Sequence, residues 1–247
     1  MDWKDIIELN CTANCSNKIQ SDPNSVNAAF EIQCPFLTGR LYKYTPLLYA
    51  CFVGNVEIAE MLIYNGADLT VVSTWKLNRA WMIENSIFQT ERARQASECL
   101  FAKNSAALHL ACSRGNVDIV ELLISHNIDL EAKDKMQETA LHKSCAFGDL
   151  GIVNILLRNG ADINAQEYNG NTPLHFACRN NHFQVVQELI GQEADLNLKN
   201  IFGKGPLFSA SSVKIANELI LNGAECGNYT ENATNLKQMN MKYDCIR

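Results

Sequence analysis

A period of 33 residues constrains this chain more than any other feature of its sequence. Three similar phrases, LHLAC, LHKSC and LHFAC, end at Cys112, Cys145 and Cys178. Aligned on these phrases, repeat units begin at Thr45, Ala106, Thr139, Thr172 and Gly205, the last four at intervals of 33 residues. A unit of this length cannot bury its own apolar face, so neighbouring units must stack into a solenoid.

Each repeat carries the signals of two helices. Thr172 can cap a helix and Pro173 suits its first position, while Leu174, Ala177 and Cys178 fall on one face. A second apolar stripe follows in each repeat, for example within residues 152–156. The pattern therefore predicts a helix-turn-helix unit.

A residue in the left-handed conformation is favoured where the second helix ends. Gly66, Gly160 and Gly223 hold that place in three repeats, and Asn127 tolerates the conformation in a fourth. Glu193 holds it in the remaining repeat, and we expect a strained or altered turn there.

These phrases resemble the ankyrin repeat. Residues 172–177 read TPLHFA, which matches the family signature TPLHxA, and residues 160–165 read GADINA, which matches the family's turn. The resemblance covers residues 45–226 and implies an all-α ankyrin-repeat solenoid of helix-turn-helix units with hairpin loops. Residues 133–207 are also similar to the later repeats of gankyrin-type proteasome assembly chaperones.

The sequence divides into five parts. We expect a degenerate N-terminal capping repeat with a long hairpin (1–44), an ankyrin repeat (45–72), a helical insertion (73–104), four ankyrin repeats of which the last is shortened (105–226), and a polar C-terminal tail (227–247). The insertion holds Trp75 and Trp81, and an amphipathic helix can start at Ala80. This helix can pack on the solenoid, represent a decayed repeat, or dock a partner.

Charge and hydropathy argue against several classes of protein. Lys and Arg number 21 and Asp and Glu number 27, which gives a net charge of −6. Without a basic block, the chain is not expected to bind nucleic acid or an anionic membrane. No apolar run reaches the ~18 residues of a membrane span, and the charged N-terminus does not resemble a secretory signal. We expect an intracellular protein, cytoplasmic or nuclear, that is monomeric.

The chain holds ten cysteines, and those that recur with the repeat, Cys112, Cys145 and Cys178, are interpreted as core residues in a reducing compartment. Cysteines one repeat apart are about 8–10 Å distant when helices stack, which is too far for a disulfide. Four glycosylation sequons, at Asn10, Asn14, Asn228 and Asn232, are counter-evidence, but they stay unused without a signal sequence.

The sequence holds few candidates for chemistry. Pairs of His and Cys three residues apart recur at His109, His142 and His175, and the resemblance gives these histidines a structural role in ordering the turns. Cys11, Cys15 and Cys34 are the basis of a remote alternative, a thiol- or metal-dependent enzyme. No nucleotide, hydrolase or metalloprotease motif is present in the sequence. We predict no catalysis, no metal and no cofactor.

The surface of the repeats is the remaining candidate for a functional site. In the ankyrin family, partners are bound by the hairpin tips and the exposed side of the first helices, which form a concave face. By position, the candidate partner-binding residues are Arg114, Met136, Phe147, Tyr168, Asn169, Arg179, Asn180, Ile201 and Phe202, together with Trp75 and Trp81 of the insertion. Aromatic and Arg side chains of this kind often dominate interfaces.

The sequence therefore predicts a non-enzymatic scaffold or adaptor that binds another protein through this concave face. The alternative within the same class is a regulatory subunit or inhibitor of a larger machine, such as a proteasome chaperone or a transcription-factor inhibitor.

Overall fold

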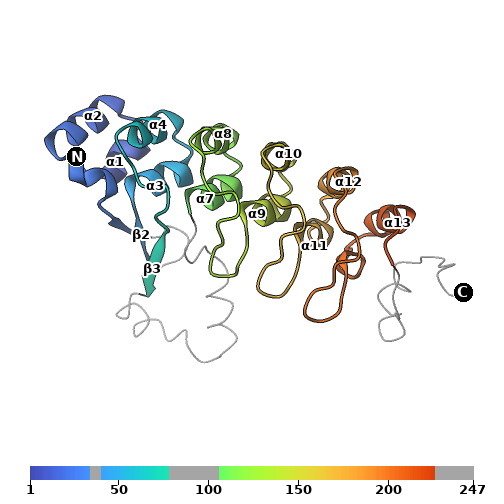
Figure 1. The fold of residues 1–247 in the computed structure, drawn as a ribbon. Coiled ribbons are helices and arrows are strands. Elements are labelled where there is room, and N and C mark those ends of the chain that lie inside the picture. The colour runs from blue at the N-terminus through green and yellow to red at the C-terminus, as the bar shows by residue number, and fades with distance from the viewer. Residues whose placement is uncertain (34–39, 78–105, 226–247) are drawn as a thin grey trace, which may run out of the picture. The chain divides into compact units, whose positions relative to one another are not determined.

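The fold is a series of short antiparallel helix pairs, seen in a computed structural model that describes residues 1–33, 40–77 and 106–225 (Figure 1). The chain divides into two compact units, Met1–Met136 (unit 1) and Gln137–Arg247 (unit 2). Nearly all regular structure is helical, as the all-α ankyrin prediction requires. None of the helices in the described ranges is long and apolar enough to span a membrane.

The described residues of unit 1 form three helix pairs and a small sheet. Its elements are α1 (Trp3–Glu8), α2 (Thr12–Ser21), a 3-10 helix η1 (Pro23–Asn27), β1 (Phe30–Gln33), β2 (Arg40–Tyr44), α3 (Pro46–Val53), α4 (Val56–Tyr64), β3 (Thr74–Leu77), α7 (Ala107–Arg114) and α8 (Val117–Ser125). The first helices pack in the order α1, α3, α7, and the second helices in the order α2, α4, α8. Successive pairs thereby bury each other's apolar faces.

The sheet of unit 1 was not predicted from the sequence. Its strands are antiparallel in the order β1-β2-β3, with Phe30 opposite Tyr44 and Arg40 opposite Leu77. The long hairpin after the first helix pair thus continues into a third strand, where the sequence Thr74-Trp75-Lys76-Leu77 has the β-branched and aromatic residues that favour strands. The expected helical insertion therefore begins with a strand, and the helix expected from Ala80 lies outside the described residues.

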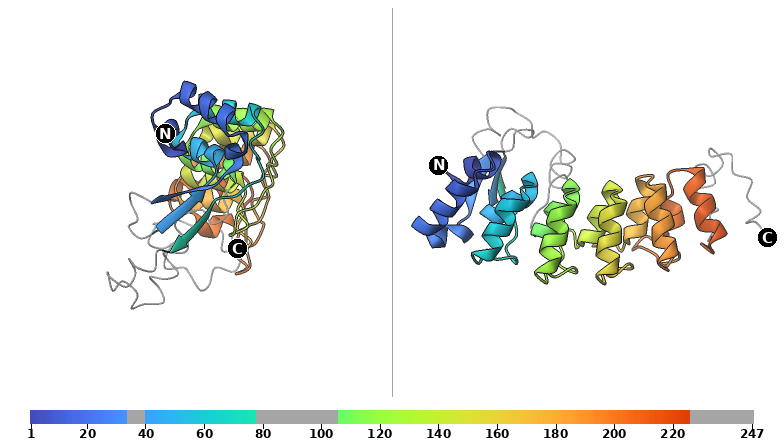
Figure 2. Two further views of the ribbon diagram at one scale, coloured as in Figure 1. Left: turned by 90° about the vertical axis from the view of Figure 1, so that its left-hand side faces the viewer. Right: turned by 90° about the horizontal axis from the view of Figure 1, so that it is seen from above.

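Unit 2 repeats the same pairing with shorter connections. Its elements are α9 (Ala140–Phe147), α10 (Leu150–Arg158), α11 (Pro173–Arg179), α12 (Phe183–Gly191), a 3-10 helix η2 (Pro206–Ser209) and α13 (Val213–Leu221). The first helices α9 and α11 and the second helices α10, α12 and α13 form two layers (Figures 1 and 2). The loops 159–172 and 192–205 leave the helices on one side (Figure 1).

The last repeat of unit 2 is shortened, because η2 replaces a complete first helix. Its connection to the preceding repeat is kept by Ser211, whose backbone N–H and hydroxyl both donate to the carbonyl oxygen of Cys178, at 3.2 and 2.8 Å. The shorter element thus still satisfies the carbonyl at the end of α11.

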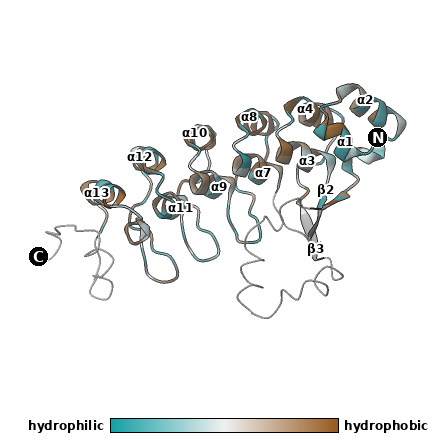
Figure 3. Cartoon of the chain, turned by 180° about the vertical axis from the view of Figure 1, so that it is seen from behind, coloured by the Kyte–Doolittle hydropathy of each residue, from teal (hydrophilic) through white to brown (hydrophobic). Residues whose placement is uncertain are grey.

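Residues of both helix layers form the core. Cys145 and Cys178 of the first helices are fully buried, as are Ile152 and Val153 of the second helix α10. Burial raises the pKa of Cys178 to about 12, so this thiol is not a nucleophile near neutral pH. The prediction that the repeat cysteines are core residues is confirmed. Hydrophobic and hydrophilic residues lie on different sides of the helices (Figure 3).

The second residue after the second helix of each of the five ankyrin repeats adopts the left-handed conformation, as predicted. The backbone angle φ is 89° at Gly160 and 96° at Gly223, and it is 58° at Asn127. Glu193 adopts the same conformation, with φ at 61°, so the turn keeps its shape. This conformation is unfavourable for a residue with a Cβ, and the backbone of Glu193 is therefore strained.

We therefore predict that Glu193→Gly stabilises unit 2 by about 0.5–1 kcal/mol, since it removes the left-handed penalty of a residue with a Cβ. The reverse change at the matched position, Gly160→Glu, should destabilise by a similar amount, because the space around Gly160 is open and only the backbone angle opposes a side chain. Urea unfolding of both variants checks the pair. A loss of stability in Glu193→Gly would contradict the expectation.

Candidate protein-binding surface

Buried histidines position the hairpin loops of unit 2. The Nδ1 atom of His175 accepts hydrogen bonds from the backbone N–H and the hydroxyl of Thr172, at 3.0 and 2.9 Å. Its Nε2–H donates to the carbonyl oxygen of Lys204 at 3.1 Å. One side chain thus closes the N-terminus of α11 and fixes the next hairpin to it.

His142 makes the same connection one repeat earlier. Its Nδ1 accepts from the N–H of Thr139 at 3.1 Å, and its Nε2–H donates to the carbonyl oxygen of Asn171 at 3.1 Å. The structural role expected for the repeat histidines is confirmed for His142 and His175.

Burial lowers the pKa of His175 below its ordinary value of 6.5. The neutral ring is the form that the native hydrogen bonds require. The stabilisation from this site is complete above pH 6.5. It is lost as the pH falls through 6.5 towards the native-state pKa, because the unfolded chain then binds the proton more readily.

We expect the free energy of unfolding to fall between pH 7.5 and 5.5 by more in the intact protein than in His175→Gln. The contribution of one histidine cannot exceed about 1.4 kcal/mol per pH unit. Urea titrations of both proteins at each pH measure the difference, in which all other titrating groups cancel. Identical pH profiles would rule out His175 as the source.

The outer ends of the two hairpins, residues 166–171 and 199–204, are called here the hairpin tips. They are joined by hydrogen bonds: Ile201 N–H donates to the carbonyl of Asn169 at 2.9 Å, and Asn200 Nδ2 donates to Asn171 Oδ1 at 2.9 Å. Gln166 Nε2 adds a bond to the carbonyl of Lys199 at 3.2 Å. The tips therefore form one rigid surface.

Gly170 allows this close approach. Its φ is +75°, and a Cβ at this position would lie 3.1 Å from the Cα of Asn200 and from the nitrogen of Ile201. Gly203, in the next tip, has a similar φ of +69° but open space around it.

The comparison of Gly170→Ala with Gly203→Ala separates backbone strain from contact between the tips. Each variant should lose about 1 kcal/mol of stability from the unfavourable φ. Gly170→Ala should lose about 1 kcal/mol more, because the hairpins must move apart. Denaturant titration of the two variants gives these values. Equal losses would show that the contact contributes nothing.

Three large apolar side chains lie exposed on the hairpin tips. Tyr168 is 71% exposed, Ile201 65% and Phe202 67%. Asn169 lies between them, half-buried, with its Nδ2 donating to Glu167 Oε2 at 3.3 Å. Four of the residues predicted to bind a partner are therefore brought together on one rigid backbone.

The first helices present a second group of predicted residues. Phe147 is 61% exposed at the end of α9. Arg179 lies exposed at the end of α11, with its guanidinium 5.3 Å from the ring centre of Phe176. Asn180 has a structural bond as well, since its Nδ2 donates to the carbonyl of Ala146 at 3.0 Å.

The remaining predicted residues belong to unit 1. Met136 is partly exposed at the end of the unit. Arg114 packs on Phe52, with its guanidinium 4.6 Å from the ring centre and its Nε donating to the carbonyl of Phe52 at 3.3 Å. Trp75 lies in strand β3, and Trp81 lies outside the described residues.

Sequence reasoning missed an aromatic cluster beside the sheet of unit 1. Tyr44, Tyr49 and Phe52 have ring centres 5.8–6.2 Å apart, and Phe30 lies edge-on to Tyr49 at 5.8 Å. Alternating aromatic residues at Tyr42 and Tyr44 are the signal that could have indicated a strand here.

The described residues offer little for catalysis or metal binding. Within them, no group of three His, Cys, Asp or Glu side chains is arranged to hold a metal ion. Of the cysteines considered for a thiol enzyme, Cys15 is buried, and burial raises its pKa to about 11. Cys11 is partly exposed, and Cys34 lies outside the described residues.

Family comparisons agree with this architecture. Models of ankyrin repeats match residues 42–74, 82–167 and 156–207, which together make up more than half of the chain. The chain belongs to the ankyrin-repeat family, whose members are generally protein–protein interaction modules. A search of curated protein sequences returned no significant match.

Proposed function

We propose that this protein is a non-enzymatic scaffold that binds a partner protein through the hairpin tips and first helices of unit 2, the face that is concave in the ankyrin family. The observation that carries the proposal is the exposure of Tyr168, Ile201 and Phe202 on hairpins that hydrogen bonds hold together. Burying one such side chain contributes about 1.5–3 kcal/mol, and a rigid backbone limits the entropy lost on binding.

The ends of the first helices extend the proposed surface. Phe147 and Arg179 are an aromatic and an Arg side chain of the type that anchors interfaces. Binding at such a surface acts by mass action, either by covering a site on the partner or by holding the partner next to another protein.

Capture from a lysate tests the proposal. The bait is the intact chain, beside a variant that combines Phe147→Ala, Tyr168→Ala, Arg179→Ala and Phe202→Ala. The control is Leu221→Ala, which removes a large apolar side chain, 83% exposed, from the second-helix layer. All three must show the same circular dichroism and urea midpoint.

We expect one protein to be retained by the intact chain and the Leu221→Ala control but not by the combined variant. With that protein purified, Tyr168→Ala alone should weaken binding by about 1–2 kcal/mol, which is roughly five- to thirty-fold in Kd. A partner held equally by all three baits would exclude this face as the binding site.

A further inference from the structure

We propose that the hairpin tips of unit 2 bind an acidic segment of the partner, with apolar side chains between its carboxylates. This inference rests on the proposed function and assigns the chemical class of the partner. It follows from the charges that surround the exposed apolar residues.

The second hairpin tip, residues 199–204, carries two basic side chains and no acidic one. Lys199 is exposed, and the Nζ of Lys204 lies 3.8 Å from the ring centre of Phe208. Among the residues that the structure describes, neither lysine forms an ion pair. The exposed ammonium group of Lys199 is therefore available to a carboxylate from another protein, and the half-buried Lys204 adds a second positive charge to the same tip.

The carboxylate within the tips is turned inward. Glu167 is buried, and its Oε1 accepts hydrogen bonds from the backbone N–H of Asn171 at 3.2 Å and from the Nδ2 of Asn171 at 2.6 Å. Its Oε2 accepts from the Nδ2 of Asn169. Glu167 thus holds the first tip in shape, and it is not exposed to a partner.

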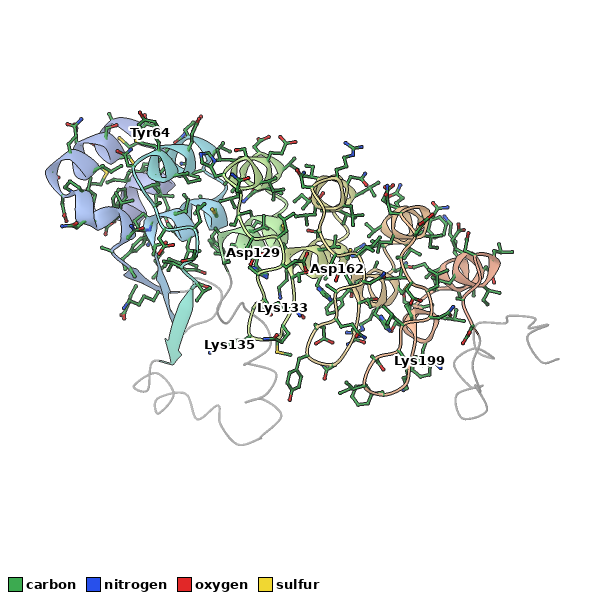
Figure 4. All side chains as sticks on the ribbon, viewed as in Figure 1. Tyr64, Asp129, Lys133, Lys135, Asp162 and Lys199 are labelled. Carbon is green, nitrogen blue, oxygen red and sulfur yellow. The ribbon has the colours of Figure 1, made fainter. Side chains whose placement is uncertain are left out.

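The exposed acidic residues lie at the base of the hairpins instead. Asp162 and Asp195 each accept a hydrogen bond from the N–H two residues further on, at 2.9 and 2.8 Å, in the turn that follows the second helix. Figure 4 shows Asp162 close to the helices and Lys199 further out on its loop. The second hairpin is therefore acidic at its base and basic towards its tip, whereas residues 159–172 of the first hairpin hold no Lys or Arg.

In unit 1, taken by itself, the loop that follows α8 also carries two lysines, together with Glu131 and Asp134. Asp129 lies near the helices, while Lys133 and Lys135 lie further out along the loop that follows α8 (Figure 4). A chain with a net charge of −6 thus places two lysines on the second hairpin tip, which holds no acidic residue. The local potential favours an anionic partner although the protein as a whole is acidic.

The apolar side chains identify a protein segment in preference to a nucleic acid. A duplex presents one phosphate per about 1.7 Å and few apolar groups along its backbone. The tips offer two lysines among Tyr168, Ile201 and Phe202, a spacing that suits scattered carboxylates and buried apolar side chains.

A displayed library of random 12-residue peptides is the probe. Selection against the intact chain should enrich peptides with net negative charge and apolar residues. The most enriched peptide is then synthesised in two forms, one native and one with every Asp and Glu replaced by Asn and Gln. We expect the second form to bind at least ten-fold more weakly.

The variants Lys204→Glu and Lys214→Glu form a matched pair. Both lysines lie over a phenylalanine ring, Lys204 at 3.8 Å from Phe208 and Lys214 at 3.6 Å from Phe183, and both changes alter the net charge equally. Lys204→Glu should raise the Kd of the peptide at least ten-fold. Lys214→Glu, on α13, should change it less than two-fold.

Several results would overturn the inference: enrichment of neutral or basic peptides, no enrichment at all, equal effects of the two charge reversals, or tighter binding of a 12-nucleotide single strand. Tyr168→Ala and Phe202→Ala distinguish the two proposals. If these variants lose a peptide that is not acidic, the binding surface stands and only its charge preference fails. If they bind every enriched peptide as the intact chain does, the proposed surface fails as well.

Discussion

The hairpins of unit 2 depend on a buried histidine near the start of the first helix. In His175 one ring nitrogen closes the helix N-terminus with Thr172, and the other holds the carbonyl of Lys204 in the next repeat. A short helix pair with little core of its own is stable only when it is fixed to its neighbours. Because this link ends on the hairpin, the interaction that joins the repeats also fixes the residues proposed to bind a partner.

The link explains why the framework repeats and the tips vary. Residues that pack against the neighbouring repeat must fit a fixed space, and Cys145 and Cys178 fill the same position in successive repeats. The turn after the second helix requires a left-handed backbone angle, which even Glu193 adopts. No such packing constraint applies to an exposed side chain on a hairpin tip, such as Tyr168. The repeated positions make the structure rigid, and the side chains of the tips can vary to suit a partner.

The sequence was sufficient to predict the helix pairs, the left-handed turns and the buried cysteines, since each follows from the spacing of a few residue types. It did not reveal the sheet, because the pairing of β2 with β3 joins residues more than thirty positions apart and is decided by tertiary contacts. At the candidate site, the exposure of Phe202 was predictable from its position in the repeat. The burial of Glu167 was not, because it depends on the side-chain amide of Asn171.

This last difference changes what the surface can recognise. Along the sequence, Glu167 offsets the charge of one of the two lysines of the tips. In the structure, amide groups surround its carboxylate, Lys199 is exposed, and Lys204 lies half-buried against Phe208. A buried carboxylate that accepts several N–H donors keeps its charge but presents little of it to an approaching partner. The preference for an acidic segment therefore arises from the fold of the hairpin and not from its composition.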